Sequence, residues 1–204
     1  MGAASSERTR VYVGIYLHDI SKLSLSDGTY EIDADLWAKW LGEFDATEIR
    51  FANASDLEFD VLDTERDGEW NSARWRVRGT MRSEFPVHDF PLDRQAVRVQ
   101  VELPRSKGEL VPDLAGSGVS HRFSITDWNW SPEFRPVMTT ERYPSDLGSI
   151  TDEGRSSEVR RVSFEVPLER PIMPVILKLF LPLAVVALMC FCRSLSHRTR
   201  FSLA

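Results

Sequence analysis

Polar and apolar residues alternate along much of the first 170 positions, with the period of two that marks strands buried on one face. The clearest case is residues 30–40, where every second residue is apolar and most of the others are charged. The same pattern predicts further strands at residues 11–17, 74–82, 96–103, 121–130, 134–143 and 158–168. No amphipathic helix of three turns is predicted before residue 170.

Turn-forming residues separate these strands. Ser26-Asp27-Gly28-Thr29 predicts a tight turn, and residues 104–118 and 144–157 predict loops. Residues 51–60 and 67–70 are expected to hold turns and short strand pieces. Short strands at this spacing are typical of two packed antiparallel sheets. We therefore predict a mostly β fold, an antiparallel immunoglobulin-like β-sandwich of about ten strands.

The alternation then gives way to a continuous apolar stretch, residues 172–192, whose single charge is Lys178. A helix of this length, at about 1.5 Å per residue, spans the ~30 Å hydrocarbon core of a bilayer. Arg193, Arg198 and Arg200 follow at once, so the positive-inside rule places the C-terminal end in the cytoplasm. A buried core helix is the less favoured interpretation, because a domain of this size rarely hides such a stretch in one helix.

The expected organisation of the chain has four parts. They are a disordered N-terminal segment (1–10), an extracellular or periplasmic sandwich (11–170), a transmembrane helix of the cell membrane (171–193), and a cytoplasmic linker with the start of a second helix (194–204). The first ten residues lack the apolar region of a signal peptide, and residues 202–204 resemble the opening of another apolar segment. Both ends are therefore expected to be truncated.

The distribution of charge supports two environments. All 31 acidic residues lie at or before Glu169, so residues 1–177, with 21 basic residues, carry −10 and the remainder carries +4. An acidic domain lacks the basic footprint of a nucleic-acid binder, and no nucleic-acid partner is expected. Both cysteines, Cys190 and Cys192, lie in the apolar stretch, so no disulfide is expected in the sandwich.

Motifs of enzymatic chemistry are missing from the sequence. The four histidines are isolated and form no metal-binding spacing, and there is no GxSxG, P-loop or GxGxxG motif. Asn53-Ala-Ser55 and Asn129-Trp-Ser131 match the glycosylation sequon, which is too short to carry weight. We expect neither an enzyme, nor a cofactor, nor a metal site.

The most specific stretch is Phe90-Pro91-Leu92-Asp93-x-Gln95, followed by an alternating strand. It resembles the signature loop of pentameric ligand-gated ion channels, the Cys-loop receptor superfamily. Residues 13–20 and 36–40 resemble the first two strands of the prokaryotic members, and residues 161–170 resemble the last strand. Pro182 matches the proline of the first membrane helix, and residues 200–203 resemble the start of the pore-lining helix. The resemblance covers nearly the whole chain in the family's order.

Three departures limit what the resemblance implies. Ser83 and Val97 stand where the family has its two half-cystines, so packing is expected to hold the loop. The WxPD motif of the first ligand-binding loop is missing. The loop at residues 144–157 lacks the vicinal cysteines of acetylcholine receptors, so recognition of the acetylcholine type is not carried over.

The resemblance assigns the signature loop to the interface with the membrane domain, where it relays ligand binding to the gate. The coupling residues it implies are Phe90, Pro91, Leu92, Asp93 and Arg170, with Asp27 of the first turn as a further candidate. We expect Asp93 and Arg170 to pair, because a partly buried charge needs a partner. Lys178 and Pro182 are the notable residues of the span, and Lys178 is expected to extend towards the interface.

The family's ligand site lies between subunits and is lined by aromatic side chains, which attract cations to their ring faces. The candidates are Trp128, Trp130 and Tyr143 on the principal side, with Asp35 and Trp37 on the complementary side. Packing in the sandwich is the alternative role for each tryptophan. The arginines at 74, 76 and 78 are expected to pair with acids on a sheet face, and an anion site is the alternative.

The sequence is thus identified as the ligand-binding portion of a pentameric ligand-gated ion channel subunit. The implied partners are identical subunits in a homopentamer, a small-molecule or ionic ligand, and the lipid bilayer. One alternative is a single-span, membrane-anchored β-sandwich that acts as a sensor or adhesion module without channel activity. Another is a solute-binding relative that keeps the scaffold but does not conduct.

Overall fold

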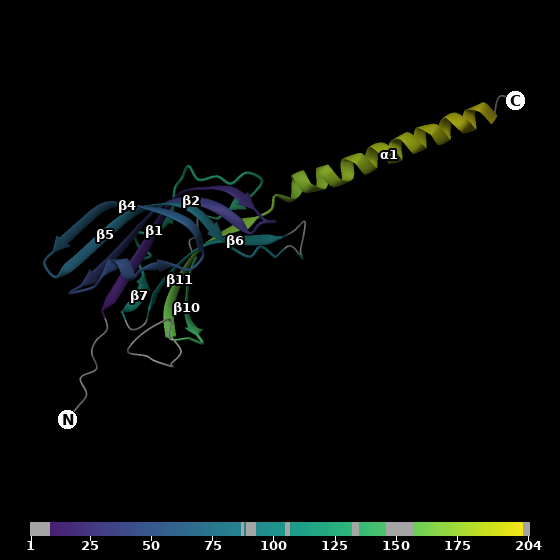
Figure 1. The fold of residues 1–204 in the computed structure, drawn as a ribbon. Coiled ribbons are helices and arrows are strands. Elements are labelled where there is room, and N and C mark those ends of the chain that lie inside the picture. The colour runs from purple at the N-terminus through teal and green to yellow at the C-terminus, as the bar shows by residue number, and fades with distance from the viewer. Residues whose placement is uncertain are drawn as a thin grey trace.

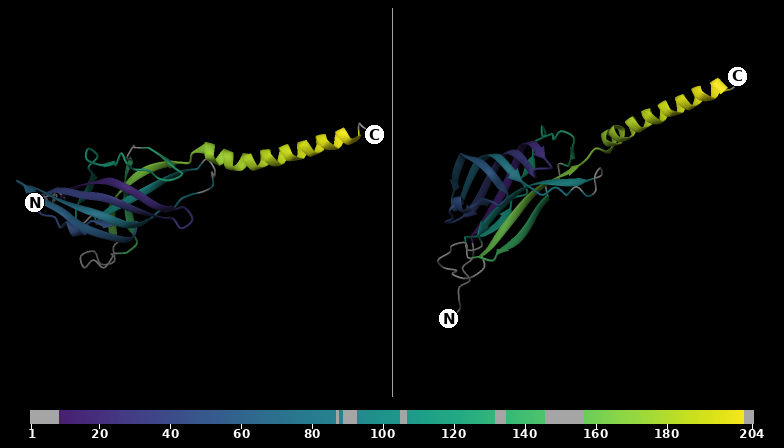
Figure 2. Two further views of the ribbon diagram at one scale, coloured as in Figure 1. Left: turned by 90° about the horizontal axis from the view of Figure 1, so that it is seen from above. Right: turned by 45° about the vertical axis from the view of Figure 1, so that its right-hand side comes forward.

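The structure, a computed structural model, describes residues 9–86, 88, 93–104, 107–131, 135–145 and 157–201 (Figure 1). This part of the chain is mostly β, arranged as two facing sheets, and it is followed by one long helix. Two further views show the sheets as two layers, with the helix projecting from one end (Figure 2). The expected combination of a β-rich domain and a C-terminal apolar helix is confirmed.

The first sheet, called sheet A here, has the strand order β4-β5-β2-β1-β7, and β8 also pairs with β1. Its strands are β1 (Arg10–Ser24), β2 (Thr29–Leu41), β4 (Ala54–Asp67), β5 (Trp70–Arg82), β7 (Glu109–Pro112) and β8 (Gly118–Val119). The long strands pair antiparallel, but β7 and β8 both run parallel to β1. The expectation of an all-antiparallel sandwich is therefore wrong at this edge.

The second sheet, sheet B, has the order β10-β11-β6-β3, and β9 pairs with β11. Its strands are β3 (Arg50–Phe51), β6 (Arg94–Pro104), β9 (Asn129–Trp130), β10 (Arg135–Tyr143) and β11 (Ser157–Glu169). All of its pairings are antiparallel. A single 3₁₀ turn, η1 (Ala46–Glu48), precedes β3 and is capped by the side chain of Asp45.

The core lies between the sheets and is built from the apolar face of each alternating strand. Ile15, Leu36 and Val77 from sheet A meet Val99 and Phe164 from sheet B in one buried cluster. The alternation in β2 has the predicted phase, because Trp40 is buried whereas Trp37 lies half-buried on the opposite face. Burial of such side chains is the main contribution to the stability of a domain that has no disulfide.

Three segments differ from the sequence predictions. Residues 54–67 form one long strand at the edge of sheet A instead of short pieces, and a register shift between Val61 and Asp63 interrupts the alternation along it. Only Asn129–Trp130 is a strand within 121–130, because Phe123 and Ile125 reach the core from an irregular segment. The predicted loop 104–118 contains β7 and the first residue of β8.

Two residues, Arg170 and Pro171, separate β11 from the helix α1 (Ile172–Phe201). Within it, Ile172–Arg193 is the one helix of the described chain that is long and apolar enough to cross a membrane, with a mean hydropathy of 2.6. This segment makes no buried contact with the sandwich, and Lys178 is exposed on it. Pro182 lies inside the helix. The expected linker from residue 194 is instead helical to Phe201, since no glycine or proline interrupts it there.

Candidate functional site at the sandwich–helix junction

Asp93 and Arg170 form a two-pronged ion pair where sheet B joins the helix. Arg170 Nε donates to Asp93 Oδ1 at 2.7 Å, and Arg170 Nη2 donates to Asp93 Oδ2 at 3.2 Å. Asp93 lies just before β6, and Arg170 lies between β11 and α1. The Asp93 side chain is 1% exposed and that of Arg170 is 17% exposed. The predicted pairing is confirmed, and its geometry is that of a strong charge-assisted contact.

Trp128 and Gln95 are two described neighbours of this ion pair. The guanidinium carbon of Arg170 lies 4.5 Å from the ring centroid of Trp128, a cation–π contact. Gln95 Nε2 donates to Asp93 Oδ2 at 3.1 Å and to the carbonyl oxygen of Pro86 at 2.6 Å. Hydrogen bonds from Arg170 hold the pKa of Asp93 below its usual range, although burial opposes them. The carboxylate therefore stays charged at neutral pH.

The other coupling candidates are Phe90, Pro91, Leu92 and Asp27. Phe90, Pro91 and Leu92 lie outside the described residues. Asp27 lies in the turn between β1 and β2, and its carboxylate accepts a hydrogen bond from Ser24 Oγ at 2.6 Å. Its contacts stay within that turn, so the structure does not join Asp27 to the Asp93–Arg170 pair.

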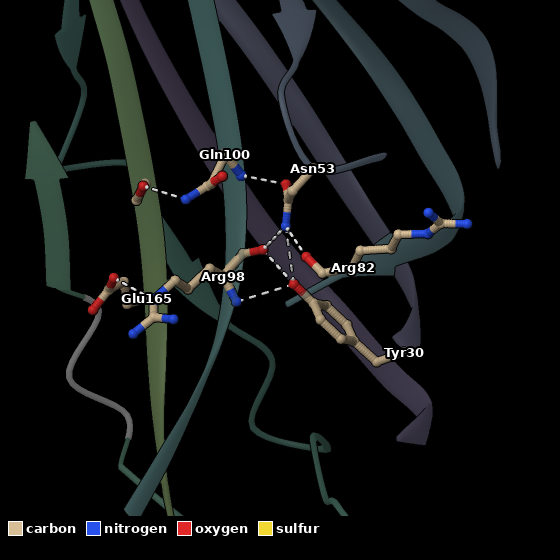
Figure 3. Close-up of polar contacts among 7 residues, drawn as sticks. Tyr30, Asn53, Arg82, Arg98, Gln100 and Glu165 are labelled. Atoms are coloured by element: carbon tan, nitrogen blue, oxygen red, sulfur yellow. Dashed lines mark hydrogen bonds and ion pairs between the residues drawn. The ribbon is translucent and has the colours of Figure 1, made fainter. Parts of the chain in front are cut away.

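A second polar cluster connects the end of β5 to β6 (Figure 3). Asn53, in the turn before β4, donates its amide to the carbonyl oxygens of Arg98 at 2.7 Å and Arg82 at 2.9 Å. Its Oδ1 accepts from the backbone N–H of Gln100 at 3.0 Å, and its carbonyl accepts from the N–H of Arg82 at 2.8 Å. One side chain therefore joins the last residue of β5 to β6 across the two sheets.

Tyr30 supports this cluster from β2. Its hydroxyl donates to the carbonyl oxygen of Arg98 and accepts from the Arg98 N–H at 3.0 Å. Tyr30 is fully buried, and burial raises the pKa of its hydroxyl to about 12. Sequence reasoning missed Tyr30 and treated Asn53 only as a weak sequon match. The available signal was a tyrosine on the apolar face of β2, whose hydroxyl needs a partner when buried.

The expected principal ligand face is not assembled. Trp130 pairs with Leu168 and Tyr143 pairs with Ser157, eleven residues apart on β11, which corresponds to about 36 Å along a strand. Trp130 packs edge-on against Phe123, with ring centroids 4.7 Å apart. The Tyr143 hydroxyl accepts a hydrogen bond from Arg161 Nη2 at 3.0 Å. These aromatics, and Trp128 next to Arg170, serve packing and ion pairing within the chain.

On the complementary side, Trp37 is held in place. Its indole N–H donates to Asp113 Oδ2 at 3.0 Å, and Lys39 Nζ donates to the same oxygen at 2.9 Å. Burial raises the pKa of Asp113, and the hydrogen bonds from Lys39 and Trp37 outweigh that effect and lower it. The ring also lies against Gly14, where an added Cβ would sit 2.4 Å from Trp37 Cε2. Trp37 is thus fixed by structure before any ligand arrives.

Asp35 belongs to a charged ladder on the outer face of sheet A. Its carboxylate contacts Arg76 Nη1 at 3.0 Å and His18 Nε2 at 3.2 Å. Burial raises its pKa, but the hydrogen bonds from Arg76 and His18 outweigh burial and lower the pKa. The arginine stripe is paired throughout, with contacts Arg74–Asp63 (3.9 Å), Arg76–Asp33 (2.5 Å), Arg78–Asp33 (3.4 Å) and Arg78–Asp60 (3.2 Å). The predicted paired sheet face is confirmed, and these arginines are not left free for an anion.

The fold and this junction define a β-rich domain joined to one apolar helix by a buried ion pair. No protein-family model matches the chain, and no curated protein matches it. Among the residues that the structure describes, no group of three or more His, Cys, Asp and Glu side chains is placed to hold a metal ion. The junction is therefore the candidate functional site of the described chain.

Proposed function

We propose that this chain is the ligand-binding portion of a pentameric ligand-gated ion channel subunit, with an immunoglobulin-like sandwich outside the cell membrane. The observation that carries the proposal is the ion pair between Asp93 and Arg170. It joins Asp93, the acidic residue of the signature motif, directly to Arg170, which lies between β11 and the apolar helix. No enzymatic activity is part of the proposal.

The ion pair gives the proposal a mechanism. Moving Asp93 away from Arg170 leaves a buried charge without its partner. The segment that carries Asp93 and the start of α1 are therefore expected to move together. Ligand binding in the sandwich then shifts the gate only through its different affinity for the open and closed states. A ring of helices is needed to line a pore, so the functional unit is a homopentamer in the bilayer.

The ligand in this proposal is a small molecule or an ion bound between subunits. Asp35 and Trp37 remain its candidates on the complementary side, because both line a hollow of about 430 Å³ with Tyr16 and Arg74. In this proposal, a neighbouring subunit provides the principal side of the ligand site. Trp128, Trp130 and Tyr143 are not proposed as one ligand-binding face, because Trp130 and Tyr143 lie at opposite ends of β11.

One observation favours a second function, a single-span membrane anchor for a sensor or adhesion domain. The helix continues without a break from Ile172 to Phe201. A channel requires a turn between its first and second membrane helices, whereas an anchor does not. The two functions predict different assemblies, which makes oligomeric state the first test.

The first experiment is mass photometry of the chain in lipid nanodiscs. The channel proposal predicts five copies per particle, whereas a monomer at all concentrations supports the anchor. The second experiment records currents from the full-length gene product in oocytes, with protons, amines and amino acids applied in turn. Arg170→Gln is expected to abolish evoked current at unchanged surface expression.

Arg94→Gln is the matched control for this measurement. Arg94 also pairs with an acid, Glu169, at 3.2 Å, but its side chain is 82% exposed. Exposed pairs contribute little, so this variant is expected to keep the current. Equal loss in both variants contradicts a specific role of the buried pair in coupling.

A further inference from the structure

An apolar cleft opens between the two sheets beside the free edge of β4. It has a volume of about 300 Å³ and shares no residue with the Asp93–Arg170 junction. Its lining comes from both sheets and from η1, and consists of Leu36, Ala46, Thr47, Ile49, Phe51, Phe59, Val61 and Trp75. Opposed walls from different elements make this a cleft and not merely an exposed sheet face.

The cleft exists because the two sheets differ in extent at this edge. β4 has fourteen residues, whereas β3, which lies at the corresponding edge of sheet B, has two. Phe51 of β3 reaches Phe59 of β4, with ring centroids 5.5 Å apart, and closes one end of the opening. Beyond that contact, Val61 has no facing strand and remains 68% exposed.

The lining is suited to an uncharged ligand. Seven of the eight residues are apolar, and three of these are aromatic. The single hydroxyl, Thr47 Oγ1, is already used, because it donates to Asp45 Oδ1 at 2.7 Å. Pockets of this size that are lined by aromatic side chains are typical of small-molecule sites, and a dry apolar cavity favours an apolar occupant.

The charges around the opening restrict the occupant further. Acidic residues follow one another along β4, at positions 56, 58, 60, 63, 65 and 67. Asp60 and Asp63 pair with Arg78 and Arg74 on the outer face, and the other acids of this edge disfavour an anion and repel the same edge of a second copy. The register shift between Val61 and Asp63 also interrupts the edge that a second strand would use.

We propose that this cleft binds a neutral molecule with one aromatic or aliphatic ring, inserted between Trp75 and the Phe51–Phe59 pair. The proposal does not depend on the channel function, because the cleft belongs to a single subunit. A ligand here contacts both sheets and so stabilises their packing.

The test uses the full chain in nanodiscs, labelled with 5-fluorotryptophan, and fluorine NMR. The chain has six tryptophans, and the Trp75 resonance is assigned with Trp75→Phe. Titration with 4-methylphenol is expected to shift the Trp75 signal saturably and to leave that of Trp70 unmoved. Its anionic counterpart, 4-methylbenzoate, is expected to bind at least about tenfold more weakly, since burial of a charge is costly.

Ala46→Phe fills the cleft and is expected to abolish the shift. Ala115→Phe, which adds the same ring to an exposed turn, is the matched control and keeps it. If Ala46→Phe disturbs the other resonances, Val61→Asp at the exposed rim replaces it. Equal shifts in the wild type and the filled variant overturn the proposal. A change in particle mass caused by Val61→Asp, without any ligand effect, also overturns it and assigns the cleft to contact between chains.

Discussion

Asn53 donates its side-chain amide to the carbonyl oxygen of Arg98 at 2.7 Å, and this contact joins the turn between β3 and β4 to β6. The same nitrogen reaches the carbonyl oxygen of Arg82. Arg82 and Arg98 are the chain neighbours of Ser83 and Val97, where the resembled family has its half-cystines. The side-chain amide of Asn53 therefore connects the two ends of this segment without a covalent bond.

Asn53→Ala is expected to destabilise the sandwich by roughly 2–4 kcal/mol, because it leaves the Gln100 N–H without its acceptor and removes one donor from each of the Arg82 and Arg98 carbonyl oxygens. The measurement is urea unfolding of the chain in micelles, followed by tryptophan fluorescence. Asn71→Ala is the matched control, since Asn71 donates only to the carbonyl oxygens of Gly42, after β2, and Glu69, in the turn between β4 and β5, and both contacts are exposed. A loss no larger than that of the control contradicts the closing role.

Tyr30→Phe is expected to change how stability depends on alkaline pH. The pKa of Tyr30 is raised to about 12 in the folded chain, so between pH 10 and 12 the unfolded state loses this proton first. Wild-type stability therefore falls as the pH rises through this window. The fall amounts to roughly 2–3 kcal/mol from this group.

The phenylalanine variant lacks that slope but begins lower at pH 7, because it loses the hydroxyl's hydrogen bonds. The free energies of unfolding of the two proteins are thus expected to converge above pH 10. Parallel curves across the whole range would rule out a raised pKa at Tyr30.

Asp93→Asn is expected to destabilise the chain at neutral pH by about 3–5 kcal/mol, the usual cost of breaking a buried pair from one side. The lowered pKa of Asp93 means that its contribution is present above the unfolded value, near 4, and is lost as the pH falls through the folded value. The gap between wild type and variant should therefore shrink in acid. Unfolding midpoints measured from pH 6 to pH 2 test this, with Glu169→Gln as the exposed control.

Gly14→Ala is expected to displace Trp37, because the new Cβ would lie 2.4 Å from its ring. Overpacking of this kind costs about 1–3 kcal/mol. Gly118→Ala is the matched control, since its Cβ would lie 3.7 Å from the Tyr16 ring, an ordinary contact. A red-shifted tryptophan emission in Gly14→Ala alone is the expected result, and equal behaviour of both variants counts against the fixed position of Trp37.

The strands that could be predicted from the sequence are those whose two faces meet different surroundings. β2 alternates because one face meets the core and the other meets charged neighbours. β4 could not be recognised as one strand, because both of its faces are largely exposed and a register shift between Val61 and Asp63 breaks the period of two that its acids follow on either side. β7 is too short to show a pattern, and its pairing with β1 joins residues about a hundred positions apart.

The junction was predictable only in part. The pairing of Asp93 with Arg170 follows from the need of a buried charge for a partner, together with the family resemblance. The contact of Trp128 with Arg170 was not predictable, since an irregular segment brings the ring there. The ligand face built from Trp130 and Tyr143 failed, because strand register, which the sequence alone does not set, places them at opposite ends of β11.

The connection between β11 and α1 is so short that a small rotation there is amplified along the helix. Only Arg170 and Pro171 separate the two elements; Arg170 is pinned by Asp93, and the ring of Pro171 fixes its own φ. The thirty residues of α1 extend for about 45 Å. A rotation of about 5° at the junction then displaces the far end of the helix by roughly 4 Å. Movements of sheet B too small to disturb its packing are thereby magnified at the far end of the helix.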